Sequence, residues 1–145
     1  MNTFELWDAL HHDPHGKDKT AGVFPRDYLA KIRKRRYPFG VIINTSKASD
    51  RDGGTHWVAV WIQSGKEAEF FDSFGKTAIF YGAEIHDFIT RMAPQCEGKY
   101  KEDYTQLQHP SSDLCVDYIG QVGSGPHGFV DDWLHCVGNV HADLP

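Results

Sequence analysis

The chain has 145 residues, of which 40% are hydrophobic and 13% aromatic, and this predicts one domain, 1–145, with a single core. A net charge of −5 argues against a dedicated nucleic-acid-binding protein. Three cysteines without C-x-x-C spacing argue against both a disulfide framework and a zinc-finger site.

The first residues predict a short helix, because Asn2 and Glu5 have the spacing of a capping box. No cationic segment is followed there by an apolar one, and no apolar run is long enough to cross a membrane. We therefore expect no signal peptide and no membrane partner. His11, His12 and His15 lie close together, but no cysteine and no cluster of carboxylates with ligand spacing accompanies them, so we interpret them as a surface loop and expect no metal.

A second helix is predicted to begin at Phe24-Pro25, because Tyr28, Leu29 and Ile32 recur at helical spacing, and to be stopped by Pro38 and Gly40. Its second half is basic, which we interpret as a solvated helix face, with a nucleic-acid or membrane contact as the alternative. The basic side chains are Lys31, Arg33, Lys34, Arg35 and Arg36. The short, apolar, β-branched run from Gly40 to Asn44 then predicts a buried strand.

The strongest pattern is a hairpin in residues 53–76, around which the chain is organised. Its first strand alternates between two faces, one with Val58, Val60 and Ile62 and the other with Trp57, Ala59 and Trp61. The turn is Ser64-Gly65-Lys66, in which Gly65 is free to take a positive φ.

The register of this hairpin decides whether His56 and Asp72 can meet. A two-residue loop would separate them onto opposite faces. A three-residue loop, Ser64 to Lys66, pairs Val58 with Asp72 and His56 with Phe74. The histidine and the aspartate are then diagonal neighbours about 7–8 Å apart at Cα, a gap that the two side chains can bridge. The function inferred below assumes this second register.

Beyond the hairpin we expect a helix, a strand and two further helices. Ile85, Phe88, Ile89 and Met92 lie at i, i+3, i+4 and i+7, which predicts an amphipathic helix that ends at Pro94. Lys99 to Leu107 predicts a strand. The next helix holds Cys115 in its first turn, and a last amphipathic helix contains residues 129–137.

Cys115 has the setting of a nucleophilic thiol. A helix N-terminus and a nearby imidazolium both lower the pKa of a cysteine and favour the reactive thiolate. His56 can take the thiol proton, and Asp72 can orient the imidazole. Gln108 and the backbone N–H of Cys115 can donate to the oxyanion of a tetrahedral intermediate.

These residues resemble the adenovirus protease (adenain) group of cysteine peptidases and, more distantly, the ubiquitin-like-protein (SUMO) proteases. The resemblance covers roughly residues 37–119, in the order His, acid, Gln, Cys. It is carried by GVIINTSKASDRDGGTHWVAVWI, FFDSFGK and QHPSSDLC. The matching residues are Gly53, Gly54, His56 and Trp57, then Phe71, Asp72, Phe74 and Gly75, then Gln108, Pro110, Ser112 and Cys115.

The resemblance implies an α+β fold in which a central mixed or antiparallel sheet packs against the helix that bears the nucleophilic cysteine. It implies an endopeptidase that binds a protein or polyprotein as an extended strand and cuts after Gly or Gly-Gly-like sites, as in viral maturation. Gly54 and Trp57 would then contact substrate, with the indole either walling a narrow tunnel or serving as a core aromatic. The scattered cysteines and the lack of a visible signal peptide predict a reducing setting that is intracellular, in host cytoplasm or nucleus, or virion-associated, and not secreted.

The resemblance also implies activators, although the chemistry itself requires no cofactor. An activating peptide would join through a disulfide at Cys96, whose alternative interpretation is a loop thiol, and DNA would contact the basic run. Two other functions stay open. The same residues would serve a protease for ubiquitin-like modifiers, whereas Val116, in place of the usual glycine after the nucleophile, favours a catalytically silent binding module.

Overall fold

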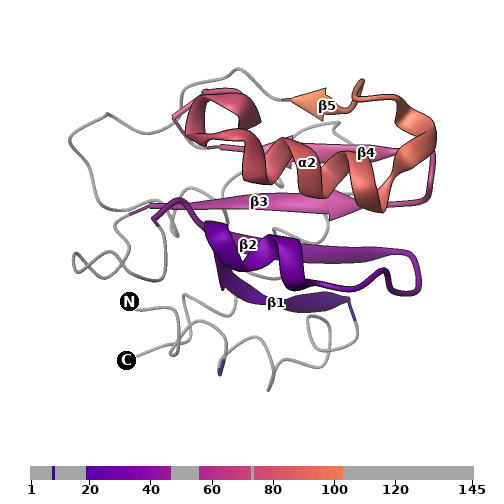
Figure 1. Ribbon diagram of the computed structural model, residues 1–145, viewed down its shortest axis with the longest axis horizontal. Helices are drawn as coiled ribbons and strands as arrows, with labels where there is room; N and C mark the ends of the chain where they lie inside the picture. The colour runs from indigo at the N-terminus through magenta and orange to yellow at the C-terminus, as the bar shows by residue number, and fades with distance from the viewer. Residues whose placement is uncertain (1–7, 9–18, 47–55, 73, 103–145) are drawn as a thin grey trace, which may run out of the picture.

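The computed structural model describes residues 8, 19–46, 56–72 and 74–102. Apart from residue 8, these form a five-stranded sheet in the order β1-β2-β3-β4-β5, with one α-helix and three short 3-10 helices (Figure 1). The elements are β1 (Thr20–Pro25), η1 (Arg26–Lys31), β2 (Phe39–Asn44), β3 (Trp57–Ile62), β4 (Ala68–Phe71), η2 (Ala78–Tyr81), α2 (Ala83–Met92), η3 (Pro94–Cys96) and β5 (Lys101–Glu102).

The sheet is mixed, which confirms the predicted α+β class. The two inner pairs, β2 with β3 and β3 with β4, are antiparallel, whereas the outer pairs, β1 with β2 and β4 with β5, are parallel. Every residue of β2 and β3 is buried, so both faces of these central strands are removed from solvent. The predicted buried strand from Gly40 to Asn44 is therefore confirmed and begins one residue earlier, at Phe39.

The β3–β4 hairpin has the register that brings the candidate residues together. Ile62 pairs with Ala68 and Ala59 with Phe71, as a three-residue loop requires. Gly65 does not use the positive φ that is open to it, because this residue is not among the glycines with positive φ. The Ser64 hydroxyl instead stabilises the turn by accepting hydrogen bonds from the backbone N–H groups of Lys66 and Glu67, at 3.1 and 3.2 Å.

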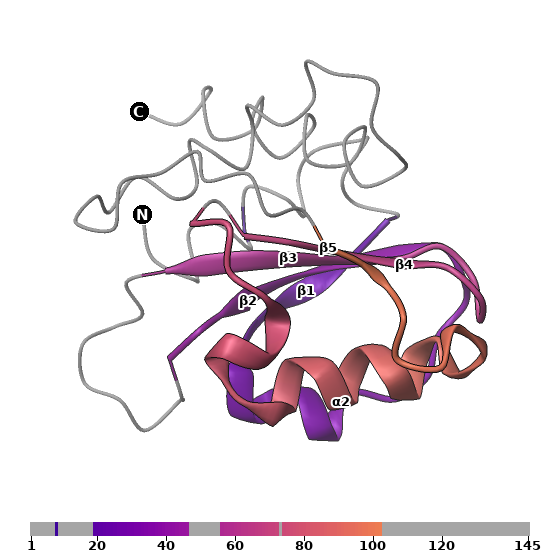
Figure 2. The same ribbon diagram turned by 90° about the horizontal axis from the view of Figure 1, so that it is seen from above.

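The helix α2 confirms the amphipathic prediction and covers one face of the sheet (Figure 2). Its four predicted core residues are all buried, and they pack with the inward side chains Val58, Val60 and Ile62 of β3. It also connects β4 to its parallel neighbour β5, a connection that needs a crossover. The Arg91 guanidinium ties it to η1 by donating to the carbonyl of Leu29 at 2.7 Å.

The helix predicted from Phe24 is wrong at both ends. Residues up to Pro25 belong to β1, where the backbone of Phe24 pairs with Ile43 of β2, and Pro25 has an extended conformation with ψ of 154°. A 3-10 helix follows, with Leu29 as its buried residue, and it ends at Lys31. Long-range parallel pairing with β2 therefore overrides the local helical spacing.

The basic run is consequently not a helix face beyond Lys31. Residues 33–36 are exposed and lie outside the helices and strands. The predicted strand from Lys99 is also shorter at its start, because β5 begins at Lys101 and residues 103–107 lie outside the described part of the chain. None of the described helices is long and apolar enough to span a membrane.

Candidate active site

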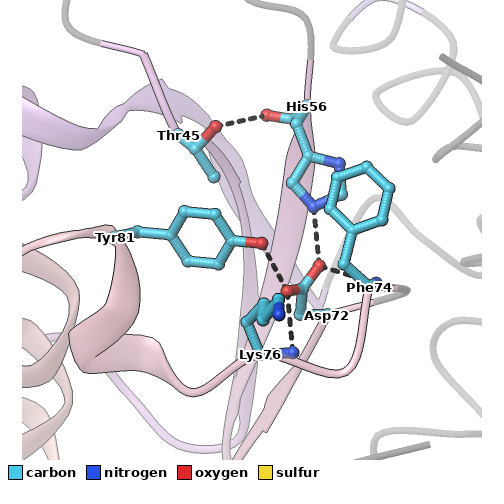
Figure 3. Close-up of polar contacts among 6 residues, drawn as sticks. All are labelled: Thr45, His56, Asp72, Phe74, Lys76 and Tyr81. Carbon is cyan, nitrogen blue, oxygen red and sulfur yellow. Dashed lines mark hydrogen bonds and ion pairs between the residues drawn. The ribbon is translucent and has the colours of Figure 1, made fainter. Parts of the chain in front are cut away.

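The antiparallel hairpin brings a histidine and an aspartate together at one end of the sheet (Figure 3). His56 immediately precedes β3 and Asp72 immediately follows β4. The imidazole Nε2 lies 2.6 Å from the Oδ1 of Asp72, and the two residues are only 6% and 0% exposed. A carboxylate in this geometry can orient an imidazole for proton transfer.

The carboxylate of Asp72 accepts two hydrogen bonds at each oxygen. Besides His56, Oδ1 accepts one from the backbone N–H of Phe74 at 3.1 Å. Oδ2 accepts one from the backbone N–H of Lys76 at 3.2 Å and another from the phenol of Tyr81. Burial of a carboxylate is costly without such donors, and this set of hydrogen bonds replaces the water that Asp72 loses in the interior.

The imidazole of His56 is fixed on its face as well as at its edge. The ring of Phe74 stacks on it with centroids 4.0 Å apart and an interplanar angle of 19°. The backbone carbonyl of His56 accepts hydrogen bonds from the N–H and the hydroxyl of Thr45, at 3.0 and 3.3 Å. The end of β2, the start of β3 and the turn after β4 therefore define the position of the ring together.

The second ring nitrogen of His56 is the one that remains for chemistry. Nδ1 is buried, and among the described residues no donor or acceptor lies within hydrogen-bond distance of it. With Nε2 carrying its proton toward Asp72, Nδ1 has a free lone pair and can accept a proton from a reacting group. This tautomer is the one that the contact with the carboxylate favours.

Of the remaining predicted site residues, the structure describes Trp57 and Cys96. Trp57 is the first residue of β3 and is buried. Gly54, Gln108 and Cys115 lie outside the described residues, as does Cys136. The structure therefore brings together the histidine and the acid and leaves the thiol and the glutamine as predictions.

Cys96, the predicted attachment point for an activating peptide, is a free thiol on η3 and is only 8% exposed. It belongs to the core cluster that contains Phe88 and Met92 of α2. A disulfide with a partner would require this part of the core to open. Within the described part of the chain, no group of three or more His, Cys, Asp or Glu residues could hold a metal ion.

Two residues at the site were not predicted from the sequence. They are Tyr81, which contacts Asp72, and Arg26, which binds the backbone of Tyr81. Arg26 donates from its guanidinium to the carbonyl of Tyr81, across a long sequence separation. An aromatic pair followed by Gly82 indicates a chain turn before a helix, but no periodicity reveals where the phenol points. The contact between His56 and Phe74, in contrast, follows directly from the predicted register.

Neither protein-family models nor curated proteins match the sequence. The resemblance to cysteine peptidases therefore stays a prediction from the three sequence motifs.

Proposed function

We propose that the protein is a cysteine endopeptidase in which Cys115 is the nucleophile and His56 and Asp72 activate it. The observation that carries the proposal is the buried contact of 2.6 Å between His56 and Asp72, which leaves Nδ1 of the imidazole without a hydrogen-bond partner among the described residues. A satisfied structural histidine would be expected to use both ring nitrogens. The order of the motifs supplies the thiol and the oxyanion donor.

In the proposed reaction, Nδ1 of His56 takes the proton of the Cys115 thiol, and the thiolate attacks the carbonyl carbon of the scissile peptide bond. The carbonyl π electrons move onto the oxygen, where Gln108 and the backbone N–H of Cys115 stabilise the charge. The imidazolium then protonates the leaving amine as the C–N bond breaks, giving a thioester. Water hydrolyses this thioester with His56 again as base, which restores the thiol.

The proposed substrate is a protein or polyprotein bound as an extended strand and cut after glycine. Gly54 would allow close approach of the substrate backbone, and Trp57 would narrow the passage to residues without a side chain. Proteins that carry ubiquitin-like modifiers are the alternative substrate class. A panel of Gly-Gly peptides and modifier precursors distinguishes the two, because the alternative requires faster turnover of the globular precursors.

Turnover of a fluorogenic Gly-Gly peptide by the native chain and by Cys115→Ala tests the proposal. We expect the variant to lose at least about 1000-fold in kcat, with Cys136→Ala as the matched control. Iodoacetamide should label Cys115 first near neutral pH. Equal and negligible turnover by the native chain and Cys115→Ala would instead identify a silent binding module and overturn the proposal.

The proposal extends to DNA only through the exposed basic segment. Arg35 and Arg36 line a concavity of about 450 Å³ together with Lys19, Tyr37 and Pro38. Such cations contact phosphates and make binding depend on salt. Replacing Arg33, Lys34, Arg35 and Arg36 by glutamine should abolish any salt-sensitive DNA binding, whereas binding that survives the change would contradict a contact at this segment.

A further inference from the structure

We propose that Tyr81 is a positioning residue for the pair of His56 and Asp72. Its phenol donates a hydrogen bond to Oδ2 of Asp72, the oxygen that does not face the imidazole. As a role in catalysis this inference rests on the proposed function, but the contact itself can be tested without turnover.

The phenol helps to fix the orientation of the carboxylate. The two oxygens of Asp72 are chemically equivalent, so the group must be held from both sides to keep one lone pair of Oδ1 aimed at Nε2 of His56. The backbone N–H groups of Phe74 and Lys76 hold it from the following turn. Among the described contacts of the carboxylate, the phenol of Tyr81 is the one donor that comes from a separate element, η2.

Tyr81 is itself held by contacts at both ends of η2. The Arg26 guanidinium donates to its carbonyl and lies 3.8 Å from the Glu84 carboxylate, which links this end to α2. At the other end, the backbone N–H of Ala78 donates to Oε2 of Glu102 in β5 at 2.9 Å. The phenol therefore reaches Asp72 from a turn fixed by β5, α2 and the start of η1.

The other side chains of η2 show that apolar packing alone does not explain this orientation. Ile79 and Phe80 are 58% and 63% exposed, whereas Tyr81 turns its ring inward to within 5.8 Å of the His56 ring, measured between centroids. A short turn placed only to bury apolar surface would bury the isoleucine and the phenylalanine first. Here polar contacts determine which side chain faces the site.

The first test compares Tyr81→Phe with Tyr28→Phe, which removes the hydroxyl of an exposed tyrosine on η1. Loss of a hydrogen bond to a charged group should lower kcat by about 10- to 100-fold while KM changes by less than about twofold. Tyr28→Phe should retain native kcat. A native kcat in Tyr81→Phe would overturn the proposal.

The second test follows the proton between His56 and Asp72 by proton NMR. Its far-downfield resonance, assigned by its loss in His56→Gln, should shift or broaden in Tyr81→Phe and stay unchanged in Tyr28→Phe. An unchanged resonance in Tyr81→Phe would overturn the positioning role. If the native chain shows no turnover beyond Cys115→Ala, the proposed peptidase fails, but the resonance still decides whether Tyr81 positions the pair.

Discussion

An amide in place of the Asp72 carboxylate would have no orientation that satisfies all of the neighbouring donors. Each oxygen faces one backbone N–H, from Phe74 or Lys76, so the NH₂ group of Asp72→Asn must point at one of these donors. The histidine can change tautomer and a phenol can rotate, but a backbone N–H can only donate. We expect the free energy of unfolding, measured in urea, to fall by about 1–3 kcal/mol.

Asp87→Asn is the matched control for this change, because it makes the same substitution at an exposed position on α2. Its free energy of unfolding should stay within about 0.5 kcal/mol of the native value. Equal stability of the two variants would mean that the donors around Asp72 do not require a carboxylate.

At the scale of elements, the junction between η2 and α2 depends on a backbone conformation that only glycine adopts readily. Gly82 has φ of 115° and ψ of 173°, and a Cβ there would lie 2.5 Å from the Glu84 carboxylate oxygen that faces Arg26. We expect Gly82→Ala to cost about 1–3 kcal/mol of unfolding free energy in urea.

Gly65→Ala provides the comparison, because a Cβ at Gly65 would meet its nearest neighbour at 3.6 Å and the backbone has no positive φ. This variant should change the free energy of unfolding by less than about 1 kcal/mol. If Gly65→Ala destabilised as strongly as Gly82→Ala, the conformation at Gly82 would not be the cause.

The elements that the sequence predicted well are those whose pattern is local. The alternation in β3 and the spacing in α2 each identify a buried face, and the loop length of the hairpin determines its register. β1 was missed because its pairing is parallel and joins it to β2 across an intervening helix and loop. Such pairing leaves no signal in neighbouring residues, and the helical spacing of Tyr28, Leu29 and Ile32 indicated a longer helix than the chain forms.

Over the whole molecule, the candidate site was predictable only where it follows from the hairpin. His56, Asp72 and the stacked Phe74 come together in one of the two registers that the sequence allows, so their proximity could be inferred only by assuming that register. Tyr81 and Arg26 reach the site through tertiary contacts that connect separate elements. Local patterns specify an element and its inward face, but they do not specify which hydroxyl or guanidinium reaches a given carboxylate.

The burial of Cys96 predicts that its reactivity reports the stability of the core. This thiol packs in the same cluster as Phe88, so iodoacetamide should label it roughly 1000-fold more slowly in the folded protein than in urea, as measured by peptide mass spectrometry. Phe88→Ala leaves a cavity that costs about 3–5 kcal/mol and should accelerate this labelling, whereas Asp87→Ala should not. Burial of the Cys96 thiol argues against a disulfide with an activating peptide. Rapid labelling of native Cys96 would contradict this, because it would show that a partner can reach the thiol.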